Sequence, residues 1–129
     1  MAKIIILGSG GFGLSIAIMC ANAGHDVTVW SKFRDEIDAI ERTGELKAKL
    51  PGVKVPPEVK LTTDISEVCD KDLVILGIPT TFCRGVCEEA AQYIQSESIV
   101  VNTAKGLEIG TLKTMSEVTK ESMPKNRVA

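Results

Sequence analysis

The chain has 129 residues, of which 44% are hydrophobic and 25% are charged, as is typical of a globular domain with a packed core. Its 15 basic and 17 acidic residues give a net charge of −2, which provides no electrostatic reason to expect a nucleic acid or an anionic membrane as partner. The apolar run at residues 4–7 is too short for a signal peptide, and no run approaches the roughly 20 residues that cross a bilayer. We therefore expect a single cytoplasmic domain without membrane insertion.

The strands and helices can be predicted in chain order, because buried apolar runs alternate with segments of helical periodicity. The predicted strands cover residues 3–7, 26–30, 59–62, 72–78 and 98–102. The predicted helices cover residues 12–23, 32–43, 82–94 and 111–123, with Ser31 as the cap of the second. A further short helix is predicted to begin with a capping box of Asp64 and Glu67 and to end near Cys69. The alternation predicts an α/β fold: a Rossmann-type, doubly wound, mainly parallel sheet with helices on both faces.

The last residues, 127–129, have the pattern of one more buried strand. Few proteins end where a buried strand begins. We therefore expect residues 1–129 to be one domain of a longer protein.

The four cysteines do not have the spacing of a disulfide framework. Cys83 and Cys87 are four residues apart and would share one face of a helix, but His25 is the only histidine, so a metal site has few candidate ligands. We expect free thiols and no metal, and the role of Cys83 and Cys87 stays open.

The loop after the first strand, residues 8–13, has the sequence GSGGFG. It fits the pattern Gly-x-Gly-x-x-Gly, and it lies between the first predicted strand and the first predicted helix, as this motif requires. Gly8 would make the tight turn, Gly10 would let the backbone approach a pyrophosphate, and Gly13 would let the helix pack on the strand. The N-terminus of the helix would then offer free N–H groups and a positive dipole end to the anion. The loop therefore predicts dinucleotide binding.

The end of the second strand bears on the choice between NAD and NADP. An NAD-specific protein usually has an acidic residue there, about 20 residues beyond the glycines, that binds the ribose 2′-hydroxyl. This chain has Trp30, Ser31, Lys32, Phe33 and Arg34 instead. Two cations and no carboxylate would tolerate or prefer a 2′-phosphate, although solvated cations at a helix start would give the same pattern. We expect NADP or NAD, with NADPH favoured.

Two further loops are predicted at the carboxyl ends of strands, where ligands of open α/β sheets bind. Residues 77–82 include Pro79, which stiffens the loop, and Phe82, which can pack on the cofactor. Residues 102–106 include Lys105, which can reach a bound phosphate or a carbonyl oxygen. A solvated loop lysine is the alternative for Lys105.

Five segments carry a resemblance to a known family. They are residues 8–13 (GSGGFG), 22–27 (NAGHDV), 50–53 (LPGV), 77–80 (GIPT) and 104–108 (AKGLE). In this order and at these spacings they resemble the N-terminal domain of bacterial NAD(P)-dependent glycerol-3-phosphate dehydrogenase, over essentially the whole chain. The resemblance implies the reversible reduction of dihydroxyacetone phosphate to sn-glycerol 3-phosphate, which supplies phospholipid synthesis.

The resemblance also implies that the cofactor site and the general base lie in two different domains. It implies a cofactor site lined by Gly11, Phe12, Lys32 and Phe33. Lys105 would contact both cofactor and substrate. The family usually has serine in place of Gly11 and often tryptophan in place of Phe12. Its general base is a lysine in a following, mostly helical domain, so we expect no catalytic residue in this chain, cofactor binding with little or no turnover, and a homodimer as one arrangement of the full-length protein.

Two alternatives stay open. The first is the cofactor domain of a related two-domain dehydrogenase, such as a ketopantoate reductase or a relative of 6-phosphogluconate dehydrogenase. Lys105-Gly106 and residues 50–52 favour the glycerol phosphate enzyme over it. The second is a non-catalytic nucleotide-sensing module, which the fold alone does not exclude.

Overall fold

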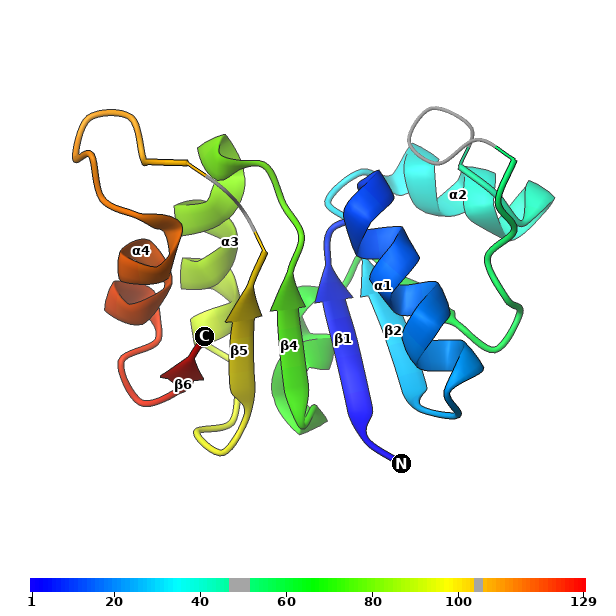
Figure 1. Ribbon diagram of the computed structural model, residues 1–129, viewed down its shortest axis with the longest axis horizontal. Helices are drawn as coiled ribbons and strands as arrows, with labels where there is room; N and C mark the ends of the chain where they lie inside the picture. Colours follow the sequence, from blue (N-terminus) through cyan, green and yellow to red (C-terminus); the bar gives the residue numbers. More distant parts are fainter. Residues whose placement is uncertain (47–51, 104–105) are drawn as a thin grey trace.

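The structure is a computed structural model, and it describes residues 1–46, 52–103 and 106–129. Its strands are β1 (Lys3–Leu7), β2 (Asp26–Trp30), β3 (Lys60–Thr62), β4 (Leu73–Leu76), β5 (Ile99–Asn102) and β6 (Arg127–Val128). Its helices are α1 (Gly11–Asn22), α2 (Arg34–Thr43), the 3₁₀ helix η1 (Ile65–Asp70), α3 (Thr80–Ala91) and α4 (Met115–Ser122). Figure 1 shows the alternation of strands and helices that the sequence predicts.

The strands form one 6-stranded sheet in the order β3-β2-β1-β4-β5-β6, in which every neighbouring pair is parallel. The chain moves outward from β1 to β3, returns to the middle, and continues outward from β4 to β6, which is the order of a doubly wound sheet. The carboxyl ends of the strands consequently lie along one edge, the upper edge in Figure 1. The prediction of a Rossmann-type, mainly parallel sheet is confirmed.

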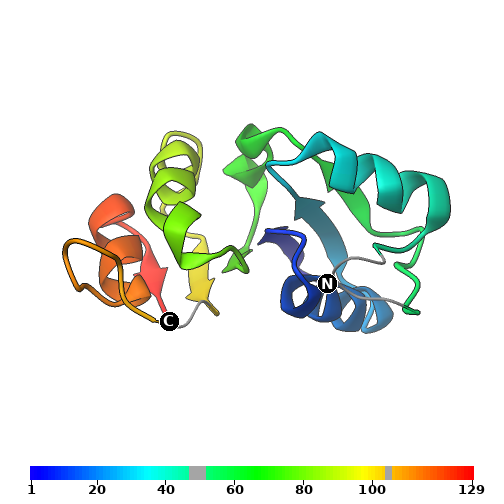
Figure 2. The ribbon, with the colours of Figure 1, turned by 90° about the horizontal axis from the view of Figure 1, so that it is seen from above.

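Alternate residues of the central strand enter two hydrophobic clusters, one on each face of the sheet. Ile4 and Ile6 belong to the cluster that includes Leu14 of α1 and residues of α2. Ile5 and Leu7 belong to the cluster formed with η1, α3 and α4. Figure 2 shows α1 and α3 on opposite sides of the sheet. Full burial of each such side chain contributes about 1.5–3 kcal/mol, so β1 is held from both faces.

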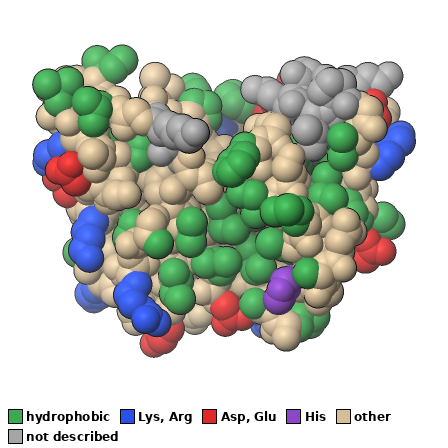
Figure 3. All heavy atoms as spheres, viewed as in Figure 1, with side chains coloured by type: hydrophobic (Ala, Val, Ile, Leu, Met, Phe, Trp, Pro, Cys, Tyr) green, Lys and Arg blue, Asp and Glu red, His purple; other side chains and the backbone are tan. Residues whose placement is uncertain are grey.

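The face that carries α1 also has partly exposed hydrophobic side chains. Leu73 of β4 and Val101 of β5 pack against the cluster under α1 but are only partly buried, and Ile99 is exposed. Figure 3 shows hydrophobic side chains gathered beside α1 over the middle of this face. Among the described segments, no helix has both the length and the apolar character needed to cross a membrane.

Helix α2 begins later than the sequence predicts, and its cap is different. The sequence predicts a start at residue 32 with Ser31 as the cap, whereas the helix begins at Arg34 and its N-cap is Phe33, without a side-chain cap bond. Ser31 instead accepts a hydrogen bond from the Phe33 N–H through Oγ, at 3.1 Å. The prediction of Ser31 as the cap is therefore wrong, because its hydroxyl holds the turn that precedes the helix.

Helix α4 also begins later than predicted. The segment before it folds back, with an antiparallel bridge between Leu107 and Thr114. Leu112 has a φ of 60°, which a helix does not allow. The helix begins at Met115, where Thr114 Oγ1 accepts from the Glu117 N–H at 3.2 Å and the Glu117 carboxylate accepts from the Thr114 N–H at 3.3 Å. This capping box fixes the true start.

The short helix predicted after Asp64 exists, although its cap differs. It is the 3₁₀ helix η1, and the Asp64 carboxylate accepts from the Ser66 N–H at 3.0 Å. The predicted reciprocal box with Glu67 is replaced by this local contact, which suits the tighter turn of a 3₁₀ helix.

Candidate functional site

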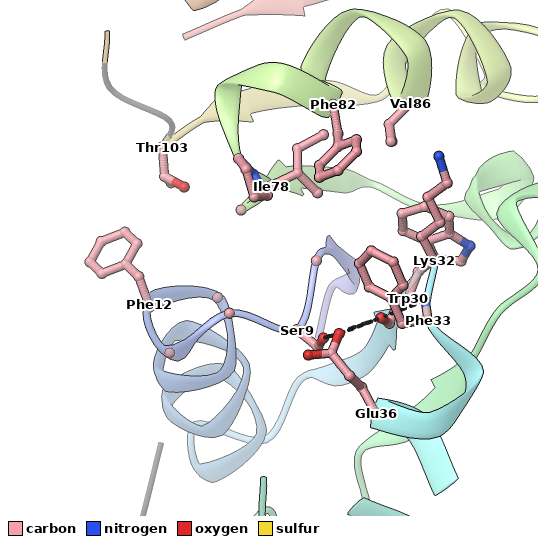
Figure 4. Close-up of a pocket in the computed structure, with 17 residues that line it drawn as sticks. Ser9, Phe12, Trp30, Lys32, Phe33, Glu36, Ile78, Phe82, Val86 and Thr103 are labelled. Atoms are coloured by element: carbon pink, nitrogen blue, oxygen red, sulfur yellow. Dashed lines mark hydrogen bonds between the residues drawn. The ribbon is translucent and has the colours of Figure 1, made fainter. Parts of the chain in front are cut away.

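A pocket of about 700 Å³ lies at the carboxyl ends of β1, β2, β4 and β5. Figure 4 shows that its walls come from the loops after these strands and from the starts of α1, α2 and α3. The lining residues are Gly8, Ser9, Gly10, Gly11, Phe12, Gly13, Trp30, Ser31, Lys32, Phe33, Glu36, Gly77, Ile78, Pro79, Phe82, Val86 and Thr103. Ligands of doubly wound sheets bind at this position, where the strand order reverses.

The glycine loop after β1 is packed directly against the backbone after β4. Gly8 has a φ of +129°, and a Cβ built on it would lie 2.4 Å from the carbonyl oxygen of Gly77. A Cβ on Gly13 would lie 3.2 Å from both the Gly8 carbonyl oxygen and the Ile6 side chain. Packing within the protein therefore requires a glycine at position 8 and favours one at position 13, where the neighbouring atoms would have to move by a few tenths of an ångström.

Gly10 differs from the other two glycines of the motif. The nearest atom to a Cβ built there is the Gly77 carbonyl oxygen, at 3.8 Å, which is an ordinary contact. Its φ of −65° and ψ of 165° suit any residue. Packing inside the described structure therefore does not require glycine at this position, and Gly10 lines the pocket, so its bare backbone leaves room for a ligand there.

The N-terminus of α1 is open toward the pocket. Its N-cap is Gly10, no side chain caps it, and its first turn contains no acidic residue. The first N–H groups of a helix have no partner within the helix, and the helix dipole adds a partial positive charge there. Together they favour an anion at this end of the pocket.

The first turn of α2 brings a carboxylate into the pocket. Glu36, in the first turn of α2, accepts a hydrogen bond from Ser9 Oγ at 2.7 Å and another from Ser31 Oγ at 3.1 Å, both through Oε1. The two hydroxyl oxygens lie 3.2 Å apart. The network joins the glycine loop to the end of β2 (Figure 4). The sequence-based interpretation found no carboxylate at this place, and the structure corrects it.

Two aromatic rings and one cation face each other across the pocket. The rings of Phe33 and Phe82 pack edge to face, with centroids 6.4 Å apart. Lys32 Nζ lies 5.3 Å from the centroid of the Phe82 ring, close enough for a cation–π contact. Arg34, the other predicted cation, does not line the pocket, and it pairs with Asp38 at 3.2 Å.

Trp30 lines the pocket at the end of β2. It is the only tryptophan of the chain, and it is 3% exposed. Its Nε1 has no hydrogen-bond partner among the described residues. Because this tryptophan lines the pocket, we expect its fluorescence to change when a ligand binds there.

Thr103 lines the β5 end of the pocket, and a charged cluster follows it in the chain. Thr103 Oγ1 donates to the Leu76 carbonyl oxygen at 2.6 Å. Further along, the Arg84 guanidinium makes two hydrogen bonds with Glu108, at 2.7 and 2.9 Å, and a contact of 3.0 Å with Glu121. The Arg84 guanidinium lowers the pKa of the Glu108 carboxyl to about 2. The cluster ties the segment after residue 105 to α3 and α4.

Most of the residues predicted for the site line this one pocket. They are Gly8, Gly10, Gly11, Phe12, Gly13, Ser31, Lys32, Phe33, Pro79 and Phe82. Arg34 lies outside the lining, and Lys105 lies outside the described residues, as do residues 50 and 51 of the LPGV segment. The other lining residues are not among the predicted ones: Ser9, Trp30, Glu36, Gly77, Ile78, Val86 and Thr103. For Glu36 the available signal was its place in the first turn of the helix after β2, which brings a side chain back toward the strand end.

Comparison with known proteins gives a consistent result. A family model described as NAD-dependent glycerol-3-phosphate dehydrogenase N-terminus matches residues 3–129. A protein of Lactobacillus delbrueckii subsp. bulgaricus named glycerol-3-phosphate dehydrogenase (NAD(P)+) 2 is 42% identical over 127 residues, which are 98% of this chain and 37% of that protein. A protein of Fusobacterium nucleatum with the name glycerol-3-phosphate dehydrogenase (NAD(P)+) is 37% identical over 95% of this chain and 37% of its own length.

Solved structures agree on the fold. The crystal structure of glycerol-3-phosphate dehydrogenase from Coxiella burnetii superposes with a TM-score of 0.87 at 23% identity, over 98% of this chain and 38% of that one. The chain thus spans little more than a third of the length of these relatives.

Proposed function

The chain belongs to the family of NAD-dependent glycerol-3-phosphate dehydrogenase N-terminal domains, and from this premise we propose that it binds NAD(P) in the pocket at the carboxyl ends of β1, β2, β4 and β5. The pyrophosphate would lie at the N-terminus of α1 and the adenosine ribose between the glycine loop and the end of β2. The nicotinamide half would extend toward Thr103. When bound, this cofactor supplies hydride transfer, and the residues of this chain hold and orient it.

Gly10 is the observation that carries this proposal. Its bare backbone is unnecessary for packing, because a Cβ would meet only one atom, 3.8 Å away. A pyrophosphate seated on the uncapped end of α1 would need that bare backbone. Binding of the cofactor therefore accounts for the glycine at position 10, which packing within the fold does not require.

The test is a titration of wild type and Gly10→Val with NADH and NADPH, followed by Trp30 fluorescence and by calorimetry. Wild type should bind, and Gly10→Val should fold normally but lose binding by at least about 100-fold, because its side chain would occupy the pyrophosphate position. Far-UV circular dichroism and the unfolding midpoint verify that the variant is folded. A folded Gly10→Val that binds as well as wild type would refute the proposed binding mode.

We propose a cofactor preference from the sequence as well. Lys32 lines the pocket and is the cation available to a 2′-phosphate, whereas Arg34 is paired with Asp38. Lys32 supports the prediction that NADPH is used and favoured. Lys32→Glu should therefore weaken NADPH more than NADH, and equal weakening of both would contradict this role.

For the parent protein we propose the reaction for which these relatives are named, the interconversion of dihydroxyacetone phosphate and glycerol 3-phosphate. In this proposal residues 1–129 are a single NAD(P)-binding domain in which Lys105 contacts cofactor and substrate. The general base lies in a separate helical domain. The isolated chain should then bind cofactor without turnover, and activity should need the longer protein.

A further inference from the structure

Glu36 places a carboxylate where the adenosine ribose of a bound dinucleotide would lie. Its two anchors belong to the two loops that flank this ribose: Ser9 to the glycine loop and Ser31 to the end of β2. In dinucleotide-binding domains the ribose hydroxyls are bound at this junction by an acidic residue at the end of β2. Here the strand end has no acidic residue, and the first turn of α2 supplies one instead.

The carboxylate is held in position and keeps one oxygen available. Ser9 and Ser31 are 5% and 2% exposed, so their hydroxyls fix Oε1 from the protein side. Within the described part of the chain, Oε2 accepts no hydrogen bond and no lysine or arginine pairs with Glu36. Figure 4 shows the carboxylate beside Ser9, facing the pocket.

We propose that Glu36 discriminates between NAD and NADP at the 2′ position of the adenosine ribose. Its Oε2 accepts a hydrogen bond from the 2′-hydroxyl of NAD and repels the 2′-phosphate of NADP. This inference rests on the proposed function. Lys32, whose Nζ lies over the Phe82 ring, attracts the 2′-phosphate. The two side chains therefore act against each other, and the chain accepts both NAD and NADP because neither charge prevails completely.

The experiment compares wild type with Glu36→Gln and a matched control, Asp35→Asn. Glutamine keeps the length of the side chain and an oxygen for the two serine hydroxyls, so it removes the charge with little change of shape. Asp35 is the other acidic residue in the first turn of α2, is exposed and does not line the pocket. Its variant therefore controls for net charge and for the helix dipole.

The readout is the ratio of the dissociation constants for NADH and NADPH, measured by Trp30 fluorescence. Glu36→Gln should change this ratio in favour of NADPH by about tenfold or more, which corresponds to about 1.4 kcal/mol. Asp35→Asn should leave the ratio within about twofold of wild type.

A second measurement needs only the wild type. The 2′-deoxyadenosine analogue of NADH should bind about tenfold more weakly than NADH itself, because it lacks the hydroxyl that donates a hydrogen bond to the charged carboxylate.

The outcomes separate the inference from the proposed function. If Glu36→Gln binds both dinucleotides and the ratio of their dissociation constants is the same as in wild type, the role of Glu36 is refuted, but the proposed cofactor site is not. An equal ratio change in Asp35→Asn, or equal binding of the deoxy analogue, also overturns it. Failure of wild type to bind either dinucleotide overturns the proposed function, and the inference falls with it.

Discussion

Substitution of Gly8 by alanine should destabilise the protein through one backbone contact. The new Cβ would lie 2.4 Å from the Gly77 carbonyl oxygen and 2.8 Å from the Gly77 carbonyl carbon, and neither can move like a flexible side chain. Overpacking of this kind costs about 1–3 kcal/mol. The φ of +129° adds strain of roughly 1–2 kcal/mol for a residue with a Cβ. We expect a total loss of about 2–5 kcal/mol, a large share of the roughly 5–15 kcal/mol that stabilises a domain.

Gly24→Ala is the matched control, because it separates the two effects. Gly24 has a φ of +90°, but a Cβ there would meet nothing within 4 Å. Its variant should lose only the backbone term, about 1–2 kcal/mol. The assay is urea unfolding followed by far-UV circular dichroism, with a check that the m-value is unchanged. If Gly8→Ala and Gly24→Ala lost the same free energy within about 0.5 kcal/mol, the tight contact between the two loops would be refuted.

Two further predictions concern the contact between Arg84 of α3 and Glu108, and the cap of α4. Arg84→Met should remove the contact that lowers the pKa of Glu108 from 4.5 to about 2. Because the pKa of Glu108 is lower in the folded state, the charged carboxylate stabilises the wild type fully above pH 4.5, and this stabilisation is lost as the pH falls through about 2. The difference in unfolding free energy between wild type and Arg84→Met should therefore decrease as the pH falls from 4.5 to about 2. A gap that stays constant from pH 7 to 2 would contradict this coupling. Thr114→Ala should lose the capping box of α4 and about 1 kcal/mol of stability in urea unfolding, whereas no change would mean that the cap contributes nothing.

The sheet was predictable from the sequence because its central strands are buried on both faces. Uninterrupted apolar runs such as Ile4 to Leu7 can be stable only between two layers of helices, and this requirement leads to the doubly wound order. The helix starts were less predictable, because hydroxyl residues have several uses. Ser31 looks like a cap by position, yet its hydroxyl is used in the turn and in the contact with Glu36.

The pocket was predictable in place but not in its full set of contacts. The glycine motif and the rule that ligands bind at the carboxyl ends of strands predict a pocket beside Gly8, Gly10 and Gly13, and these residues line the pocket of the structure. The position of Glu36 depends on how α2 is rotated against the glycine loop, which a local pattern does not specify. The contact between Arg84 and Glu108 likewise joins residues 24 positions apart, through the packing of α3 against the segment before α4.

The most direct test of the cofactor site is a backbone amide NMR titration of the 129-residue chain with NADH. We expect the largest chemical-shift changes on the amides of residues 8–13 and 31–33, around the open end of α1 and the end of β2. Shifts confined to other parts of the surface, or none at a millimolar concentration of NADH, would contradict the assignment of this pocket as the NAD(P) site.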